Sequence, residues 1–225
     1  MSGKKDVDAW DLEYAHLEWG GGSDAAWMKE KIPPGRLILD AGCGTGRFLK
    51  EFYASNPCIG LDFSKPAVVR SAEAIERLYN KLPESKKINA YLPEFVVGDI
   101  TRLPFSGGFD AIICLGVLQH LEKAGREKAV SEFFRILQPN GYVFFEAFGV
   151  KDMKFGSEEP EPGPEPNTFV RKNGIMYHYF DESEVRDLFE KNGFQTIDIV
   201  SREKEKKYDG VVHIRHHIRG IFEKR

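Results

Sequence analysis

The chain has 225 residues, a formal net charge of −3 at pH 7, 41% hydrophobic and 30% charged residues. This composition is typical of a soluble globular protein, and the length suits one α/β domain, residues 1–225, with insertions. The charge gives no indication of nucleic-acid binding, no hydrophobic run approaches the roughly 20 residues of a membrane span, and the polar start is not a signal peptide. Three cysteines without metal-ligand spacing favour a cytoplasmic protein and predict no metal site.

The N-terminal segment, residues 1–35, is expected to cover the sheet of the domain. Trp10 and Tyr14 are four residues apart, as on one face of a helix. Three glycines follow Trp19 and precede a second short helical pattern. The segment is either a fixed cap or a lid that folds over a ligand, and three glycines, which would be costly in a purely structural connector, favour the lid.

Residues 36–53 predict a strand, a glycine turn and a helix. The apolar run at 37–39 suits a buried strand, and the apolar spacing within 47–53 is helical. Between them, Asp40 ends the strand and glycines occupy every second position from Gly42 to Gly46. Such a turn lets a ligand approach the main chain closely, and the free N–H groups of the next helix can hold its polar end.

The sequence Asp-Ala-Gly-Cys-Gly-Thr-Gly at 40–46 resembles the first motif of the Rossmann-fold (class I) S-adenosylmethionine (SAM)-dependent methyltransferases. It differs from the dinucleotide fingerprint because its third glycine comes one residue early, which disfavours a nicotinamide dehydrogenase. The resemblance implies that SAM is the cofactor and that N-terminal segments fold over it. The cofactor-binding residues that it implies in this loop are Asp40, Ala41, Gly42, Cys43, Gly44 and Gly46.

A second acidic residue, Asp62, lies 20 residues beyond Gly42 and ends another apolar run. An acid at this distance is placed to accept hydrogen bonds from a ribose. Asp62 could instead be a turn residue or a helix cap, but Ser64 already suits the cap of a helix over 65–80. Phe63 and Ser64 are predicted to lie beside the cofactor together with Asp62.

Further strands are expected at 95–97, 111–115 and 142–147, with a helix at 124–137. Asp99-Ile100 matches the adenine-contact position of the resembled family, although an Asx turn would use the same residues. Leu115 is expected to close the cofactor cleft. Five strand-helix repeats predict an α/β fold, namely a doubly wound, mainly parallel seven-stranded sheet with helices on both faces and a closing antiparallel hairpin. The cofactor residues should converge at the carboxyl ends of its strands.

Residues 148–180 interrupt this pattern. The proline-rich part of this insertion predicts an extended loop, because alternate prolines exclude helix and central strand. It leaves the sheet on the cofactor side, so it is a candidate flap beside the substrate. His178 follows it within an aromatic cluster and is the candidate catalytic base. The other substrate-side candidates are Trp19, His120, Tyr177, His213 and Arg215.

The C-terminal segment predicts a helix over 182–192 and two strands, 194–200 and 211–222, joined by a charged loop at 202–209. His213, Arg215 and His217 would share one face of the second strand. From Arg202 to Arg225, 8 basic residues face 4 acidic residues, a local charge of +4. This excess favours a solvated surface over a nucleic-acid stripe.

Three functions are compatible with the sequence. The first is a methyltransferase for an unidentified acceptor, preferably a small molecule. The second is a tRNA-modifying enzyme, since the layout, including Tyr-His-Tyr-Phe at 177–180, is similar to wobble-uridine methyltransferases. The third is a non-catalytic SAM-binding protein, because no catalytic residue is certain. In-line methyl transfer needs mainly proximity and alignment, which explains why the sequence identifies the cofactor better than the acceptor.

Overall fold

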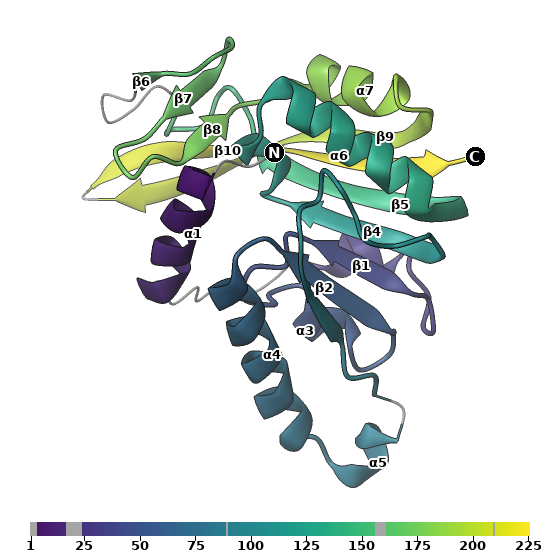
Figure 1. Ribbon diagram of the computed structural model, residues 1–225. Helices are drawn as coiled ribbons and strands as arrows, with labels where there is room; N and C mark the ends of the chain where they lie inside the picture. The colour runs from purple at the N-terminus through teal and green to yellow at the C-terminus, as the bar shows by residue number, and fades with distance from the viewer. Residues whose placement is uncertain (1–3, 17–23, 89, 156–160, 209) are drawn as a thin grey trace.

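The computed structural model describes residues 4–16, 24–88, 90–155, 161–208 and 210–225. They include a seven-stranded sheet in the order β3-β2-β1-β4-β5-β10-β9, in which β10 runs antiparallel to the other six strands (Figure 1). The predicted fold class is therefore confirmed. The strands are β1 (Ile38–Ala41), β2 (Cys58–Asp62), β3 (Glu94–Val97), β4 (Phe109–Leu115), β5 (Leu137–Phe148), β9 (Phe194–Tyr208) and β10 (Val211–Lys224).

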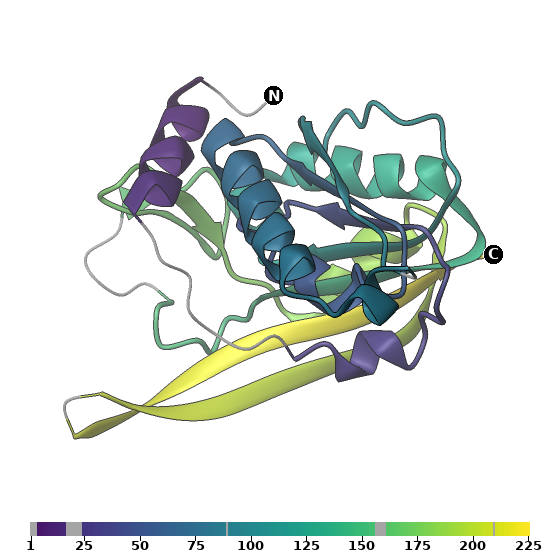
Figure 2. The same ribbon diagram turned by 90° about the horizontal axis from the view of Figure 1, so that it is seen from below.

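Helices pack on both faces of this sheet because its central strands are hydrophobic on both sides. Phe133 of α6 and Phe189 of α7 belong to the core on one face, whereas Met28 of α2, Phe52 of α3 and Ile75 of α4 belong to the core on the other. The helices are α1 (Lys4–His16), α2 (Ala26–Lys29), α3 (Leu49–Phe52), α4 (Lys65–Asn80), α5 (Glu84–Lys87), η1 (Leu118–His120), α6 (Lys123–Ile136) and α7 (Glu182–Glu190). The N-terminal helix α1 lies beside α4 in both ribbon views (Figures 1 and 2).

The parallel register brings the carboxyl ends of the central strands to one edge. Ala41 of β1 pairs with Leu61 of β2, and Leu115 of β4 pairs with Glu146 of β5. The turns that follow β1, β2 and β4 therefore start close together, as expected for a ligand site in a doubly wound sheet.

The C-terminal hairpin is longer than predicted. Residues 202–208, expected to be a loop, belong to β9 and pair with β10 as far as Tyr208 opposite Val211. This expectation was wrong because a high density of charge does not exclude a strand: an exposed two-stranded ribbon can carry charge on both faces. Figure 2 shows the paired strands extending well beyond the remainder of the sheet.

The insertion also contains strands that the sequence did not predict. A small antiparallel sheet consists of β6 (Glu161–Pro162), β7 (Thr168–Val170) and β8 (Met176–His178). The prolines are compatible with it because β6 is a two-residue edge strand, where a missing N–H donor is tolerated.

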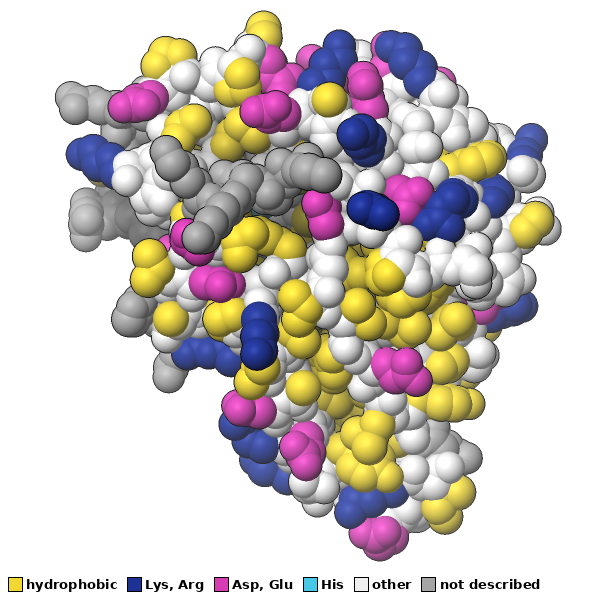
Figure 3. Space-filling view, in the orientation of Figure 1, with side chains coloured by type: hydrophobic (Ala, Val, Ile, Leu, Met, Phe, Trp, Pro, Cys, Tyr) yellow, Lys and Arg dark blue, Asp and Glu magenta, His cyan; other side chains and the backbone are white. Residues whose placement is uncertain are grey.

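The opposite end of the large sheet is partly uncovered. The segment between β3 and β4 contains no helix, and Tyr91, Leu92 and Val97 are exposed near this edge. Figure 3 shows hydrophobic side chains gathered over this end of the molecule. Tyr91 and Leu92 precede β3, whereas Val97 pairs with Asp62 at the carboxyl end of the strands, so this surface extends along the edge strand toward the candidate site.

Candidate functional site

The glycine turn after β1 is shaped by close backbone contacts. The N–H groups of Gly42 and Cys43 donate to the carbonyl of Leu61 at 2.7 and 3.0 Å. Gly42 has a φ of 84°, and a Cβ added there would lie 2.4 Å from the Val117 side chain. Because the turn packs closely against the end of β2 and the segment after β4, only glycine fits this position.

Asp62 joins the end of β2 to the glycine turn. Its Oδ2 accepts a hydrogen bond of 2.9 Å from the N–H of Gly44, and its Oδ1 accepts one of 2.9 Å from the N–H of Ser64. Burial raises the pKa of Asp62 to about 6, although the hydrogen bonds from the backbone act in the opposite direction. Each carboxylate oxygen has a further lone pair, so Asp62 can still accept hydrogen bonds from a ligand.

Asp40 supplies a buried oxygen that has no hydrogen-bond partner. Asp40 is only 3% exposed, and its Oδ2 has no hydrogen-bond partner among the described residues. Burial, followed by the charge of Asp62, raises the pKa of Asp40 to about 8. An unpartnered buried carboxylate beside a glycine turn fits a ligand with a cationic group, because a positive charge would satisfy the oxygen and favour its ionised form. SAM carries such groups, so these residues fit the expected cofactor.

The other residues expected to contact the cofactor surround the same edge. Phe63 follows Asp62 directly and is half-buried, and Leu115 is half-buried at the end of β4. The Oδ1 of Asp99 accepts a hydrogen bond of 2.8 Å from the N–H of Thr101, and Ile100 is buried. Asp99 therefore forms an Asx turn, which leaves its second oxygen available for a ligand.

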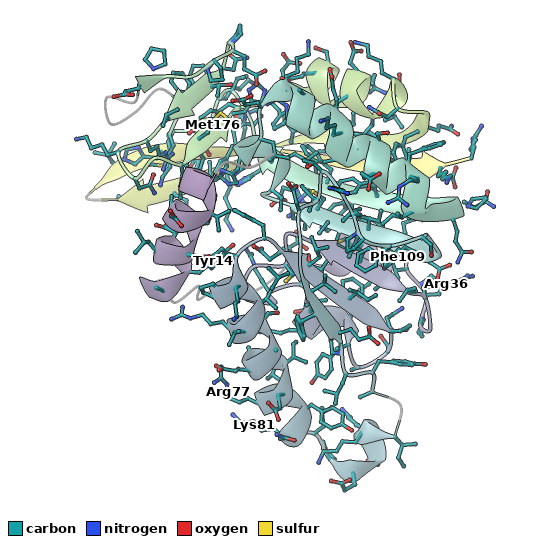
Figure 4. The ribbon with its side chains drawn as sticks, viewed as in Figure 1. Tyr14, Arg36, Arg77, Lys81, Phe109 and Met176 are labelled. Carbon is teal, nitrogen blue, oxygen red and sulfur yellow. The ribbon has the colours of Figure 1, made fainter. Side chains whose placement is uncertain are left out.

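Helix α1 lies over the glycine turn. The Ser64 hydroxyl and Asp11 Oδ1 are 2.5 Å apart, and the Arg70 guanidinium donates to the carbonyl of Ala15 at 3.0 Å. The Tyr14 hydroxyl would be 3.0 Å from a Cβ placed on Gly44, and Figure 4 shows Tyr14 on the side of α1 that faces the sheet. These contacts fit the lid interpretation, which stays a prediction. Trp19 and the three glycines at 20–22 lie outside the described residues.

Aromatic side chains from four segments meet beside this turn. His120 of η1 makes edge contacts with Trp10 of α1 and Tyr177 of β8, with ring centroids 4.7 Å apart in each case. Phe148 at the end of β5 stacks on Tyr177 at 6.3 Å. We call Trp10, His120, Tyr177 and Phe148 the aromatic group. Of these four residues, the sequence predicted only His120 and Tyr177 to lie on the substrate side.

His120 is held as a neutral side chain within this group. Its Nδ1 lies 2.8 Å from the carbonyl of Met176, so Nδ1 carries the proton, and its Nε2 accepts from Gln119 Nε2 at 3.2 Å. Burial lowers the pKa of His120 to about 4. His120 therefore contributes shape and a fixed orientation at neutral pH rather than positive charge.

His178 does not point toward the aromatic group. It is 2% exposed; its Nδ1 lies 2.7 Å from the Thr168 hydroxyl, and its Nε2 lies 2.9 Å from Glu184 Oε1. Arg126, also buried, binds Glu184 and Glu165 in the same network. The expectation that His178 faces the acceptor does not fit this arrangement, because both ring nitrogens already hold β7 and α7 together.

The two candidates on β10 differ in position. Arg215 donates from Nε to Asp152 Oδ2 at 2.8 Å, and its guanidinium lies 4.9 Å from the Phe148 ring centroid, beside the aromatic group. His213 pairs with Lys206 farther along the hairpin. His217, which was not selected, pairs with Phe148 and packs against its ring at 5.2 Å. The predicted shared face of β10 could have identified His217 once the position of Phe148 was known.

The described residues contain neither a metal-binding cluster nor a membrane-spanning helix. No group of three or more His, Cys, Asp or Glu side chains among them is arranged to hold a metal ion. Within the same residues, no helix is both long and apolar enough to cross a membrane.

Known proteins resemble this chain in sequence and in fold. A family model described as a methyltransferase domain matches residues 39–145. A tRNA (carboxymethyluridine(34)-5-O)-methyltransferase of Arabidopsis thaliana is 35% identical over 53% of this chain and 27% of its own length. The tRNA N(3)-methylcytidine methyltransferase Mettl2 of Drosophila melanogaster is 28% identical over 71% of this chain and 49% of its own. The chain therefore spans about a quarter and about half of these two relatives.

A solved structure has the same fold. The SAM-dependent methyltransferase of Methanosarcina mazei superposes with a TM-score of 0.70 at 20% identity, over 88% of this chain and 97% of the other. At this identity the likeness concerns the fold, which includes the sheet edge where the glycine turn, Asp62 and Asp99 meet.

Proposed function

We propose that this chain, whose residues 39–145 match a methyltransferase domain, is a SAM-dependent methyltransferase that transfers the cofactor's methyl group to a nucleoside of tRNA. The observation that carries the proposal is that Asp40, whose Oδ2 has no hydrogen-bond partner among the described residues, meets the glycine turn and Asp62 at one sheet edge, directly beside the aromatic group. A cofactor site and a wall for a planar acceptor are thus adjacent.

We assign residues of this chain to three parts of the cofactor. Asp40 and the turn from Gly42 to Gly46 would hold the charged amino-acid end, because an unsatisfied carboxylate and backbone N–H groups lie there. Asp62 would accept hydrogen bonds from the ribose hydroxyls. Asp99 and Ile100 would contact the adenine. When bound, SAM supplies a methyl group on a sulfonium, which an acceptor can attack directly.

The protein's contribution to the reaction is binding, orientation and exclusion of water. Tyr14 and Trp10 on α1 lie over the cofactor side and the acceptor side of the site respectively, so closure of this helix would align both ligands. Water exclusion also strengthens electrostatic interactions at the reacting centre. His120 is neutral and oriented by Met176, so it would position the acceptor without adding charge.

Two observations support a tRNA acceptor. Both curated relatives described above are named as tRNA methyltransferases. Trp10, Tyr177 and Phe148 are half-buried aromatic side chains, and such side chains stack on bases that are turned out of a single-stranded loop. A small-molecule acceptor is the second candidate, favoured by the net charge of −3, which gives the chain as a whole no attraction for polyanions.

The test is an acceptor assay with methyl-labelled SAM. Total tRNA in one arm and a low-molecular-weight cell extract in the other are incubated with the protein, and the label is measured in each fraction. We expect the wild-type protein to label tRNA. Trp10→Ala should lose this labelling and keep its SAM affinity in calorimetry. Label in the low-molecular-weight fraction alone would replace the tRNA proposal with the second candidate.

A further inference from the structure

The hairpin of β9 and β10 separates its charges by face. Its register places Arg202 opposite His217, Lys204 opposite Arg215 and Lys206 opposite His213. Because side chains alternate along a strand, these residues project from one face. We call Arg202, Lys204, Lys206 and Arg215 the basic face.

On the opposite face, this outer part of the hairpin carries two acidic residues and one lysine. Glu203 lies opposite His216, Glu205 opposite Ile214 and Lys207 opposite Val212. Glu203 pairs there with Lys151 at 2.9 Å. The modest local charge calculated from the sequence therefore includes a strongly cationic face and a mixed face.

Stability alone does not explain the basic face. Directly opposite like charges destabilise a strand pair, and Lys204 and Arg215 occupy such a position. Acidic partners are concentrated at its inner end, where Asp24 lies 3.5 Å from Arg202 and Asp152 binds Arg215. Among the described residues, no carboxylate forms an ion pair with Lys204 or Lys206, and both are exposed. The outer part of the face is thus available to an external anion.

The basic face continues into the candidate acceptor site. The Arg215 guanidinium covers the Phe148 ring, which stacks on Tyr177. The exposed part of the hairpin then leads away from this point, beyond the sheet (Figure 2). A ligand that presents one group to the aromatic group and a chain of negative charges along the hairpin would fit both surfaces.

We propose that the basic face binds the phosphate backbone of the tRNA while the acceptor nucleoside of the same tRNA packs against the aromatic group. This inference rests on the proposed function and adds a contact surface outside the methyl-transfer site. Lysine and arginine side chains on phosphates supply most of the sequence-independent affinity for nucleic acid. An acidic membrane surface offers similar charge, but it would not explain why the face leads to an aromatic site for a planar group.

Two neighbouring lysines provide a matched test. Lys206→Glu changes the basic face, whereas Lys207→Glu makes the same charge change on the opposite face, one residue away, and both side chains are exposed. Fluorescence anisotropy with labelled total tRNA is measured over a range of salt concentrations. Lys206→Glu should weaken binding roughly tenfold at low salt, and Lys204→Glu/Lys206→Glu should lower the slope of log affinity against log salt by about 1.4, or about 0.7 per lost contact. Lys207→Glu should have less than about a third of the single-variant effect.

The outcomes separate this inference from the proposed function. Equal losses in Lys206→Glu and Lys207→Glu, or a preference for phosphatidylserine vesicles over tRNA, would overturn the basic face as an RNA site, even if tRNA is methylated. If Lys206→Glu weakens tRNA binding more than Lys207→Glu but tRNA is not methylated, the basic face is supported as an RNA-binding surface and the proposal that tRNA is the methyl acceptor is rejected. Circular dichroism and calorimetric SAM binding, expected to be unchanged in all three variants, confirm that each is folded.

Discussion

Asp62 Oδ2 accepts a hydrogen bond of 2.9 Å from the N–H of Gly44, which fixes the glycine turn after β1 to the end of β2. Both strands are parallel neighbours, so one carboxylate sets the geometry of two turns at the same sheet edge. A ligand bound by either turn depends on this contact.

Asp62→Ala should weaken SAM binding by about 1.5–3 kcal/mol, because a charged hydrogen-bond acceptor is lost from the proposed ribose site. Asp110→Ala is the matched control: Asp110 Oδ2 also accepts a backbone N–H, from Leu37 at 2.9 Å, but at the other end of β1. Both variants should lose stability, and only Asp62→Ala should lose affinity in calorimetry. Unchanged affinity in folded Asp62→Ala would make Asp62 a turn residue.

Without cofactor, the free energy of unfolding should fall as pH rises. Burial raises the pKa of Asp40 to about 8 and that of Asp62 to about 6, whereas both titrate near roughly 3.9 when unfolded. Between about pH 4 and pH 8 the folded protein therefore holds protons that the unfolded chain has lost, and stability decreases. Urea denaturation of wild type and Asp40→Asn tests this prediction. The variant should show a flatter decrease above pH 6; parallel curves would mean that Asp40 is already ionised there.

Helix α1 should become more protected when the cofactor product S-adenosylhomocysteine binds. Its contacts with the site run through Asp11 to Ser64 and through Tyr14 to Gly44. Hydrogen exchange of residues 10–16 should slow with ligand, and Asp11→Ala should reduce that protection. Asp8→Ala, an exposed change on the same helix, serves as the control. Protection that is high without ligand and unaltered by it would indicate a fixed cap.

His178→Ala should act on stability more than on chemistry. Removing the imidazole leaves the Thr168 hydroxyl and the Glu184 carboxylate without their buried partner, which should cost about 1–3 kcal/mol of unfolding free energy. Turnover per folded molecule should fall by less than the loss expected on removal of a general base. A loss of roughly 10²–10⁴-fold at unchanged stability would instead restore His178 as the base.

The parts of the site that the sequence predicted are local. The glycine turn and Asp62 are recognisable because spacing along one strand-turn-helix unit determines their geometry. Tyr14 and Asp11 gave no such signal, since their partners at Gly44 and Ser64 come from different elements. Topology favoured His178, but its orientation depends on Thr168 and Glu184, which lie in another strand and a helix.

The basic face was hidden for a related reason. Arg202, Lys204 and Lys206 alternate with Glu203 and Glu205, so the charges of residues 202–206 nearly cancel in the sequence. Only the pairing with β10 shows that this segment is a strand and that the two signs project from opposite faces.

The glycine turn at 40–46 and Asp62 form the proposed SAM site. Calorimetric titration of the wild-type protein with SAM and with NAD, each repeated with Asp40→Asn, tests this assignment. We expect micromolar-range SAM binding that weakens in Asp40→Asn, and no NAD binding. Binding of NAD without SAM, or SAM affinity that is the same in wild type and Asp40→Asn, would contradict this assignment.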